Sequence, residues 1–242
     1  MPVDLAAFLW LALIVLVSAF VQGMVGFAFG MIAMGFATLV LDARMASFLI
    51  APLATVNIAI VLWSVRDRVR LAIVGPIMLG SLTGLPFGLV ILLGGSAYVI
   101  RVLIALLLIY VGVTRLVRRT VTPRPLSLWW GTVAGLASGV IGGATNMGGP
   151  PLIAYAARQT WSPETFKATL LTIFFIGSFT KTIVLIWQGA LNRPMLRLTA
   201  VLVPIICVGS AVGISLFNRI DGERFGRIVA VVLLVLGVWL LL

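Results

Sequence analysis

The sequence predicts an all-α integral membrane protein built from two inverted-topology repeats, each with three full spans and one broken or re-entrant glycine-rich helical segment. Three observations predict this fold: an apolar composition, motifs that recur in the same order in both halves, and glycine and proline clusters inside charge-free stretches. Apolar residues make up 62% and charged residues 10% of the 242 residues, and the mean hydropathy is +1.24. Soluble domains average about 45–50% apolar and about 25% charged residues. The chain therefore belongs in a lipid bilayer.

Eight apolar segments follow one another along the chain, and a helix needs about 20 apolar residues to cross the hydrocarbon core. In chain order they are residues 5–41, 45–65, 71–93, 98–117, 128–157, 166–188, 198–218 and 226–242. The first and the fifth are long and rich in glycine. In the fifth, the stretch "GVIGGATNMGGPP" (139–151) places five glycines and two prolines in the middle. Glycine and proline are the weakest helix formers, so we expect breaks at membrane depth and about eight to ten membrane segments.

The two halves of the chain resemble each other. The stretch "SAFVQGMVGFAFGM" (18–31) aligns with "GLASGVIGGATNM" (135–147). The positions that then match, in the same order in both halves, are Gly23 with Gly139, Gly26 with Gly142, Trp63 with Trp187 and Pro76 with Pro204. Any two apolar helices look alike, but a kept order of glycine, tryptophan and proline favours duplication. We expect residues 1–120 to form the first repeat and residues 125–242 the second, within one transmembrane domain.

The distribution of lysine and arginine over the loops predicts how the glycine-rich segments run. If segment 128–157 crosses the membrane once, the two sides receive nine and seven of these residues; if it returns, they receive twelve and four. Cytoplasmic loops carry the excess of Lys and Arg, so we expect this segment to go in and come back, or to be two short helices joined at depth. By repeat symmetry segment 5–41 does the same, which inverts the second repeat and places both termini outside.

The charged residues exclude several classes of function. The chain has 17 Lys and Arg, six Asp and Glu, no His and one Cys, with a net charge of +11. All six carboxylates lie outside the apolar runs or at their ends. A Ser–His hydrolase and a His-ligated metal enzyme are excluded, so we expect no enzyme activity, metal or cofactor. The arginines lie in short loops such as 66–70, where membrane anchoring explains them, and nucleic acid is not expected as a partner.

The predicted site lies where the two broken segments meet. Irregular backbone at membrane depth is tolerated when it is buried in protein or lines an aqueous cavity, and secondary transporters with discontinuous helices bind substrate near the midplane. Free N–H groups at half-helix N-termini attract anions. We expect a small anion to bind at Gln22, Gly23, Gly26, Gly142, Gly143, Thr145, Asn146, Gly148, Gly149 and Pro150. The stretches "GLASG" (135–139), "GSLTG" (80–84) and "GSAVG" (209–213) are interpreted instead as close contacts between helices.

Lys181 lies inside the apolar stretch "FIGSFTKTIVLIW" (175–187). A lysine at membrane depth costs about 2.5–3.5 kcal/mol on insertion scales, so it is a candidate for substrate contact or charge balance. The alternative is that its ammonium reaches the membrane surface, because the span ends about two turns further on. When Trp63 is aligned with Trp187, Asn57 takes the matching position, and we place both residues beside the anion.

With its duplicated, chiefly eight-span organisation and "GVIGGATNMGGPPLIAYA" opening the second half, the chain resembles the TauE/SafE sulfite exporter family over essentially its whole length. The first motif, "VQGMVGFAFGMIAM", departs from the family's glycine clusters by carrying Phe27 and Phe29. The resemblance implies carriage of small sulfur-containing or organic anions, such as sulfite, sulfoacetate or other sulfonates, across the bacterial inner membrane.

Taken together, the residues and the resemblance predict a secondary transporter that exports a small anion by alternating access, with the lipid bilayer as its surroundings. Two alternatives stay open. The first is an anion channel with the same site, and the second is an accessory membrane subunit whose glycines only pack helices. A cation transporter is least expected, because nothing anionic faces the core. The sequence leaves open which anion is carried, what drives it and whether the chain forms a homo-oligomer.

Overall fold

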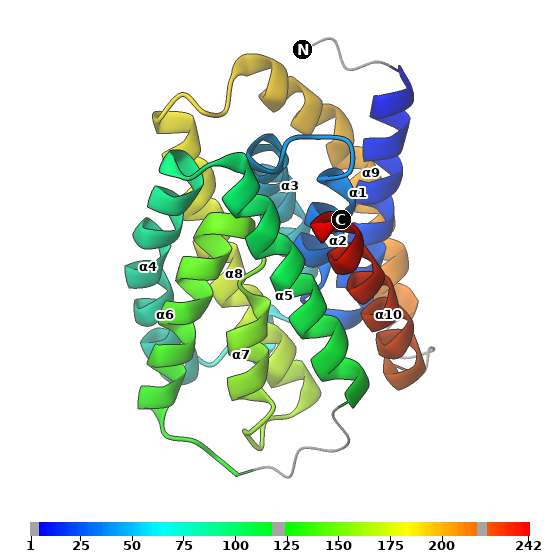
Figure 1. The fold of residues 1–242 in the computed structure, drawn as a ribbon. Helices are drawn as coiled ribbons and strands as arrows, with labels where there is room; N and C mark the ends of the chain where they lie inside the picture. The colour runs from blue at the N-terminus through cyan, green and yellow to red at the C-terminus, as the bar shows by residue number, and fades with distance from the viewer. Residues whose placement is uncertain (1–4, 118–123, 217–221) are drawn as a thin grey trace.

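The computed structural model describes residues 5–117, 124–216 and 222–242, and every regular element in this part of the chain is a helix (Figure 1). The predicted all-α class is confirmed. Six of the described helices are long and apolar enough to cross a membrane: α1 (Leu5–Val25), α3 (Ala43–Trp63), α4 (Leu71–Gly94), α5 (Ala97–Val117), α8 (Pro163–Trp187) and α9 (Arg193–Leu216). The shorter or less apolar ones are α2 (Phe29–Ala37), the 3-10 turn η1 (Arg66–Arg68), α6 (Leu128–Thr145), α7 (Gly149–Ala156) and α10 (Gly222–Leu241).

Each glycine-rich segment is divided into two helices, as the sequence predicts. The first break separates α1 from α2 at Gly26, whose φ is 92°, and the second separates α6 from α7 at Asn146, whose φ is 60°. Glycine adopts a positive φ freely, and asparagine tolerates it because its side chain can hydrogen-bond locally. Pro150 and Pro151 follow in the first turn of α7. Proline lacks a backbone N–H, and in the first turn this N–H would have no acceptor within the helix.

The second broken segment returns to the end of the bundle from which it starts. Gln159, just after α7, donates a hydrogen bond from Nε2 to the carbonyl of Leu126, just before α6, at 3.1 Å. Figure 1 shows the same course: α6 rises from the lower end and α7 descends toward it. The segment therefore goes in and comes back, as the loop charges predict.

Side-chain caps determine where α3 and α8 begin. The Asp42 carboxylate accepts a hydrogen bond from the amide of Arg44 at 2.9 Å, and the Ser162 hydroxyl accepts one from the amide of Thr165 at 3.2 Å. Both helices start directly after their cap, two to three residues earlier than the apolar pattern predicts. Lys167, the second residue of the predicted segment 166–188, therefore lies inside α8.

Glycines form the tightest helix contacts. α4 packs along α6, and α1 packs along α9. At these contacts a Cβ atom would collide with a carbonyl group of the neighbouring helix, as for Gly84 with Leu136, Gly139 with Ser81 and Gly213 with Phe20. Small residues let helix backbones approach closely in a membrane. The interpretation of "GLASG", "GSLTG" and "GSAVG" as helix contacts is confirmed.

The helices of the two predicted repeats are interleaved. α3 packs on α8 and α5 packs on α10, and each of these pairs joins two helices that match in the predicted alignment. α4 packs on α6, and the matching helices α9 and α1 pack on each other in the same way. This is the set of contacts expected of two repeats related by a two-fold axis. The division into repeats at residues 1–120 and 125–242, and their inversion, stay predictions that this arrangement favours.

Candidate functional site

A cavity of about 70 Å³ lies where the two breaks meet, between α1, α2, α3, α4, α6, α7 and α8. A cavity needs about 10–15 Å³ to hold one water molecule, so this one has room for several waters or for one small polyatomic ion. Seven of the predicted site residues line it: Gln22, Gly142, Gly143, Asn146, Gly148, Gly149 and Lys181.

Two other predicted residues hold helices together beside the cavity. Gly23 packs against α9, where a Cβ would lie 2.8 Å from the carbonyl oxygen of Ser210. The side chain of Asn57 donates to the hydroxyl of the same Ser210 at 2.7 Å. Gly23 and Asn57 therefore join α1 and α3 to α9, and the structure does not bring them to the cavity wall.

The remaining predicted residues shape the two breaks. The hydroxyl of Thr145 donates to the carbonyl of Ile141 at 2.7 Å and accepts from the amide of Met147 at 3.2 Å, so it ends α6. Gly26 turns the first break through its positive φ. Pro150 is buried in the first turn of α7. These three residues lie off the cavity wall and give the backbone its course around it.

Lys181 is the centre of a buried hydrogen-bond network on one side of the cavity. Its side chain is 1% exposed, and its ammonium donates to the hydroxyl of Ser47 at 3.1 Å and to the carbonyl of Gly142 at 3.2 Å. The amide of Asn146 donates to the carbonyl and to the hydroxyl of the same Ser47, at 2.9 and 3.0 Å. Ser47 on α3 thus joins the lysine of α8 to the residue that forms the second break.

The charge of this lysine has no anionic partner among the described side chains. None of the described residues that line the cavity carries a carboxylate. Asp42, Asp67 and Glu164 are exposed. A buried charge without a partner is costly, and an ammonium has three donors, of which two are used by Ser47 and Gly142. The site is therefore suited to an anion.

Gln22 adds a second unpaired donor to the cavity. Its side-chain oxygen accepts a hydrogen bond from the amide of Phe29 at 2.8 Å, which caps the start of α2. Its Nε2 atom is buried and has no hydrogen-bond partner in the part of the chain that the structure describes. The first amides of a helix also lack partners within the helix, and Gly30 and Met31 of α2 line the same cavity.

The rest of the wall is largely apolar, with three serines that the predicted site did not include. The apolar lining comes from Phe27, Phe29, Met31, Ala54, Ile58, Leu85, Met147, Ile173 and Phe174, and the three serines are Ser81, Ser138 and Ser178. The predicted site also missed Ser47, which does not line the cavity but holds Lys181. No signal in the sequence distinguishes Ser47 from other small residues of its helix.

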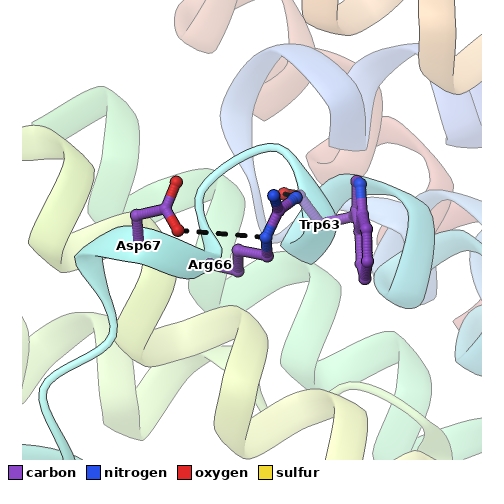
Figure 2. Close-up of polar contacts among 3 residues, drawn as sticks. All are labelled: Trp63, Arg66 and Asp67. Atoms are coloured by element: carbon purple, nitrogen blue, oxygen red, sulfur yellow. Dashed lines mark hydrogen bonds and ion pairs between the residues drawn. The ribbon is translucent and has the colours of Figure 1, made fainter.

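One end of the bundle is basic. This basic end comprises residues 64–70, the start of α6, the end of α7 and the start of α8. Within it η1 contacts α8, and the hydrogen bond between Gln159 and Leu126 joins the end of α7 to the start of α6. Figure 2 shows a turn at this end: the Arg66 guanidinium lies 4.1 Å from the centre of the Trp63 ring and pairs with Asp67 at 3.8 Å. Trp63 is 70% exposed. An exposed tryptophan with an adjacent arginine is typical of the membrane–water interface.

The long apolar helices, the backbone broken around a cavity and the buried lysine define a multi-pass membrane protein of the transporter class. The family model described as "Sulfite exporter TauE/SafE" matches residues 11–240, and the chain belongs to this family. It is 25% identical over 209 residues to the "Probable sulfite/organosulfonate exporter TauE" of Cupriavidus necator, covering 79% of this chain and 77% of that relative. No solved structure matches the chain. The protein is thus a transporter and not an enzyme, as the sequence predicts.

Proposed function

We propose that the protein exports small sulfur-containing or organic anions, such as sulfite, sulfoacetate or other sulfonates, and that the anion binds in the cavity between the two breaks. The observation that carries this proposal is Lys181, a buried lysine on the cavity wall that has no carboxylate partner among the described residues. The name of the Cupriavidus necator relative supports the same class of substrate.

The cavity offers donors on one side and apolar surface on the other. A sulfite or sulfonate group has three oxygens that accept hydrogen bonds. The unused N–H of Lys181, the free amide of Gln22 and the first amides of α2 are the donors that would meet them. Charge-assisted hydrogen bonds of this kind are the stronger ones. The short organic group of a sulfonate would lie against Ile58 and Phe174.

We place the basic end in the cytoplasm of a bacterial cell and the protein in the inner membrane, because cytoplasmic loops carry the excess of Lys and Arg. Both termini then lie outside. In this orientation an inside-negative potential drives an anion outward, by about 2.3 kcal/mol per charge for each 100 mV. Export therefore needs no proton relay through protein carboxylates. A proton carried on the substrate and a coupled sodium ion are two other means of driving transport.

Alternating access would come from movement of one repeat against the other. The two breaks belong to different predicted repeats and both contribute to the cavity wall. A rocking motion of this kind would expose the same donors first to one side and then to the other.

Counterflow in liposomes tests this proposal. Purified protein is reconstituted with unlabelled sulfoacetate or sulfite inside, and uptake of the labelled anion is measured for the wild type, Lys181→Gln and the surface control Arg193→Gln. The proposal expects saturable uptake, accelerated by the internal anion and lost only in Lys181→Gln. A current that does not saturate would indicate a channel and overturn alternating access. No anion flux with any probe would overturn export and favour an accessory subunit.

A further inference from the structure

α8 carries a second buried lysine, Lys167, which the proposed site does not use. Its side chain is 5% exposed, and its ammonium donates to the carbonyl of Gly23 at 2.8 Å. Its stem lies against Gly26, where a Cβ would come within 2.8 Å of Cγ of the lysine. A bulkier residue at position 26 would push this stem away. The missing side chain of Gly26 at the first break therefore leaves the space in which the stem of Lys167 lies.

Lys167 and Lys181 lie on the same face of α8. They are 14 positions apart in the sequence, which is about 21 Å along an α-helix, and Phe174 lies midway between them on the cavity wall. Each ammonium caps the end of a helix that leads into a break: Lys167 bonds Gly23 in the last turn of α1, and Lys181 bonds Gly142 in the last turn of α6. Cations are favoured at such C-terminal carbonyls.

An apolar cluster, here called the plug, fills the space between the cavity and the basic end. Its buried residues come from α4, α7 and α8 and are Val74, Ile77, Leu152, Tyr155, Leu170 and Ile173. Ile173 also lines the cavity, and Tyr155 contacts Trp161, which precedes α8 at the basic end, with ring centres 5.9 Å apart. Beside the plug, Phe27 of the first break meets Phe166 with ring centres 6.5 Å apart.

We propose that Lys167 is a second anion-contacting residue, which meets the transported anion between the cavity and the basic end when the plug opens. This inference rests on the proposed function. In the structure the plug residues are buried against one another, and the ammonium of Lys167 donates to the carbonyl of Gly23. When the plug opens, an anion replaces this carbonyl as its partner. A fixed positive charge there lowers the barrier for an anion that passes between apolar walls, as rings of basic residues do in anion pores.

A reactive thiol in the cavity makes this proposal testable. Gly177 lines the cavity, and the nearest atom to a Cβ built there is the Ser81 hydroxyl at 3.9 Å, so Gly177→Cys has room. Cys207 is the one cysteine of the chain and is replaced by serine. Anionic and cationic methanethiosulfonate reagents of similar size are then applied separately to each face of membrane vesicles, and their rates of reaction at position 177 are compared.

The proposal expects the anionic reagent to react faster than the cationic one. Lys167→Gln should lower this ratio several-fold for reagents applied at the basic end and leave it unchanged for the opposite face. Glutamine still offers an amide to Gly23, so the variant loses the charge while keeping a donor. Lys167→Arg should keep the ratio. Lys181→Gln should lower it from both faces.

Two results would overturn the inference. The first is an unchanged ratio in Lys167→Gln at the basic end while Lys181→Gln lowers it, because Lys167 would then only cap α1 and the proposed function would survive. The second is no labelling from the basic end in the parent protein, because a plug that never opens gives Lys167 no anion to meet. If neither lysine affects the ratio, the proposed anion site itself fails.

Discussion

Gly30 and Asn146 are in contact where the two breaks meet: the carbonyl oxygen of Asn146 occupies the space that a Cβ on Gly30 would need. In the predicted alignment these residues take matching positions, one in each half of the chain. Their contact brings the start of α2 against the end of α6 and leaves the cavity beside them. The hydrogen-bond donors of both broken segments therefore lie around the same cavity.

This contact predicts that Gly30→Ala damages the fold. The added methyl group collides with backbone and not with a side chain that can move aside, and overpacking of this kind costs about 1–3 kcal/mol or more. We expect a clear fall in the melting temperature of the purified protein. Gly94→Ala is the control, because no atom lies within 4 Å of a Cβ at that position. Equal melting temperatures for the two variants would contradict the close approach of the breaks.

Ser47 should matter through Lys181 and Asn146. Ser47→Ala removes the hydroxyl that accepts from both side chains, and loss of a buried hydrogen-bond partner costs about 1–3 kcal/mol. We expect weaker anion binding, measured by isothermal titration calorimetry with methanesulfonate. Ser18→Ala is a matched control, because the Ser18 hydroxyl is buried and has no partner among the described residues. If Ser47→Ala binds the anion as tightly as Ser18→Ala, the network does not position Lys181.

Gly177 offers a way to fill the cavity without disturbing its walls. Gly177→Leu places a side chain where the nearest atom to the Cβ is 3.9 Å away. We expect the variant to fold and to lose anion flux in liposomes, because its side chain takes up the volume of the substrate. Gly94→Leu, at the open end of α4, should transport like the wild type. Transport by Gly177→Leu at the wild-type rate would show that the anion passes elsewhere.

Asn146→Asp should block the site by supplying the missing negative charge. Aspartate has nearly the same shape as asparagine and tolerates the left-handed backbone of this position. Its carboxylate would lie in the network that Ser47 shares with Lys181 and would pair with the ammonium. We expect a folded protein that no longer binds small anions in calorimetry. Asn146→Gly, which keeps the backbone and adds no charge, should bind anions better than Asn146→Asp does. Anion binding by Asn146→Asp at wild-type strength would contradict the role of Lys181.

The helical class and the breaks could be predicted from the sequence because they depend on local properties. Apolar runs specify helices that lie in a bilayer, and glycine, asparagine and proline mark where such helices end. The return of the second broken segment could also be predicted, because Lys and Arg are more frequent in loops on the cytoplasmic side of the membrane. Asp42 and Ser162 are visible as caps for the same local reason.

The partners of the site residues could not be predicted, because they depend on contacts between distant parts of the chain. Lys181 stands out as a charge in an apolar span, but its partner Ser47 is 134 residues away in sequence. Asn57 and Gly23 looked like site residues and instead bind α9. Lys167 lies in the predicted segment 166–188, but its partner Gly23 is 144 residues away in sequence.

Thermal stability with added anions tests the central claim most directly, since a ligand that binds the folded state raises the melting temperature with its concentration. Purified wild type, Lys181→Gln and Arg193→Gln are heated with increasing sulfite or methanesulfonate at constant ionic strength. The account predicts a concentration-dependent rise for the wild type and Arg193→Gln and none for Lys181→Gln. A wild-type protein that no anion stabilises, or a Lys181→Gln variant that responds like the wild type, would contradict it.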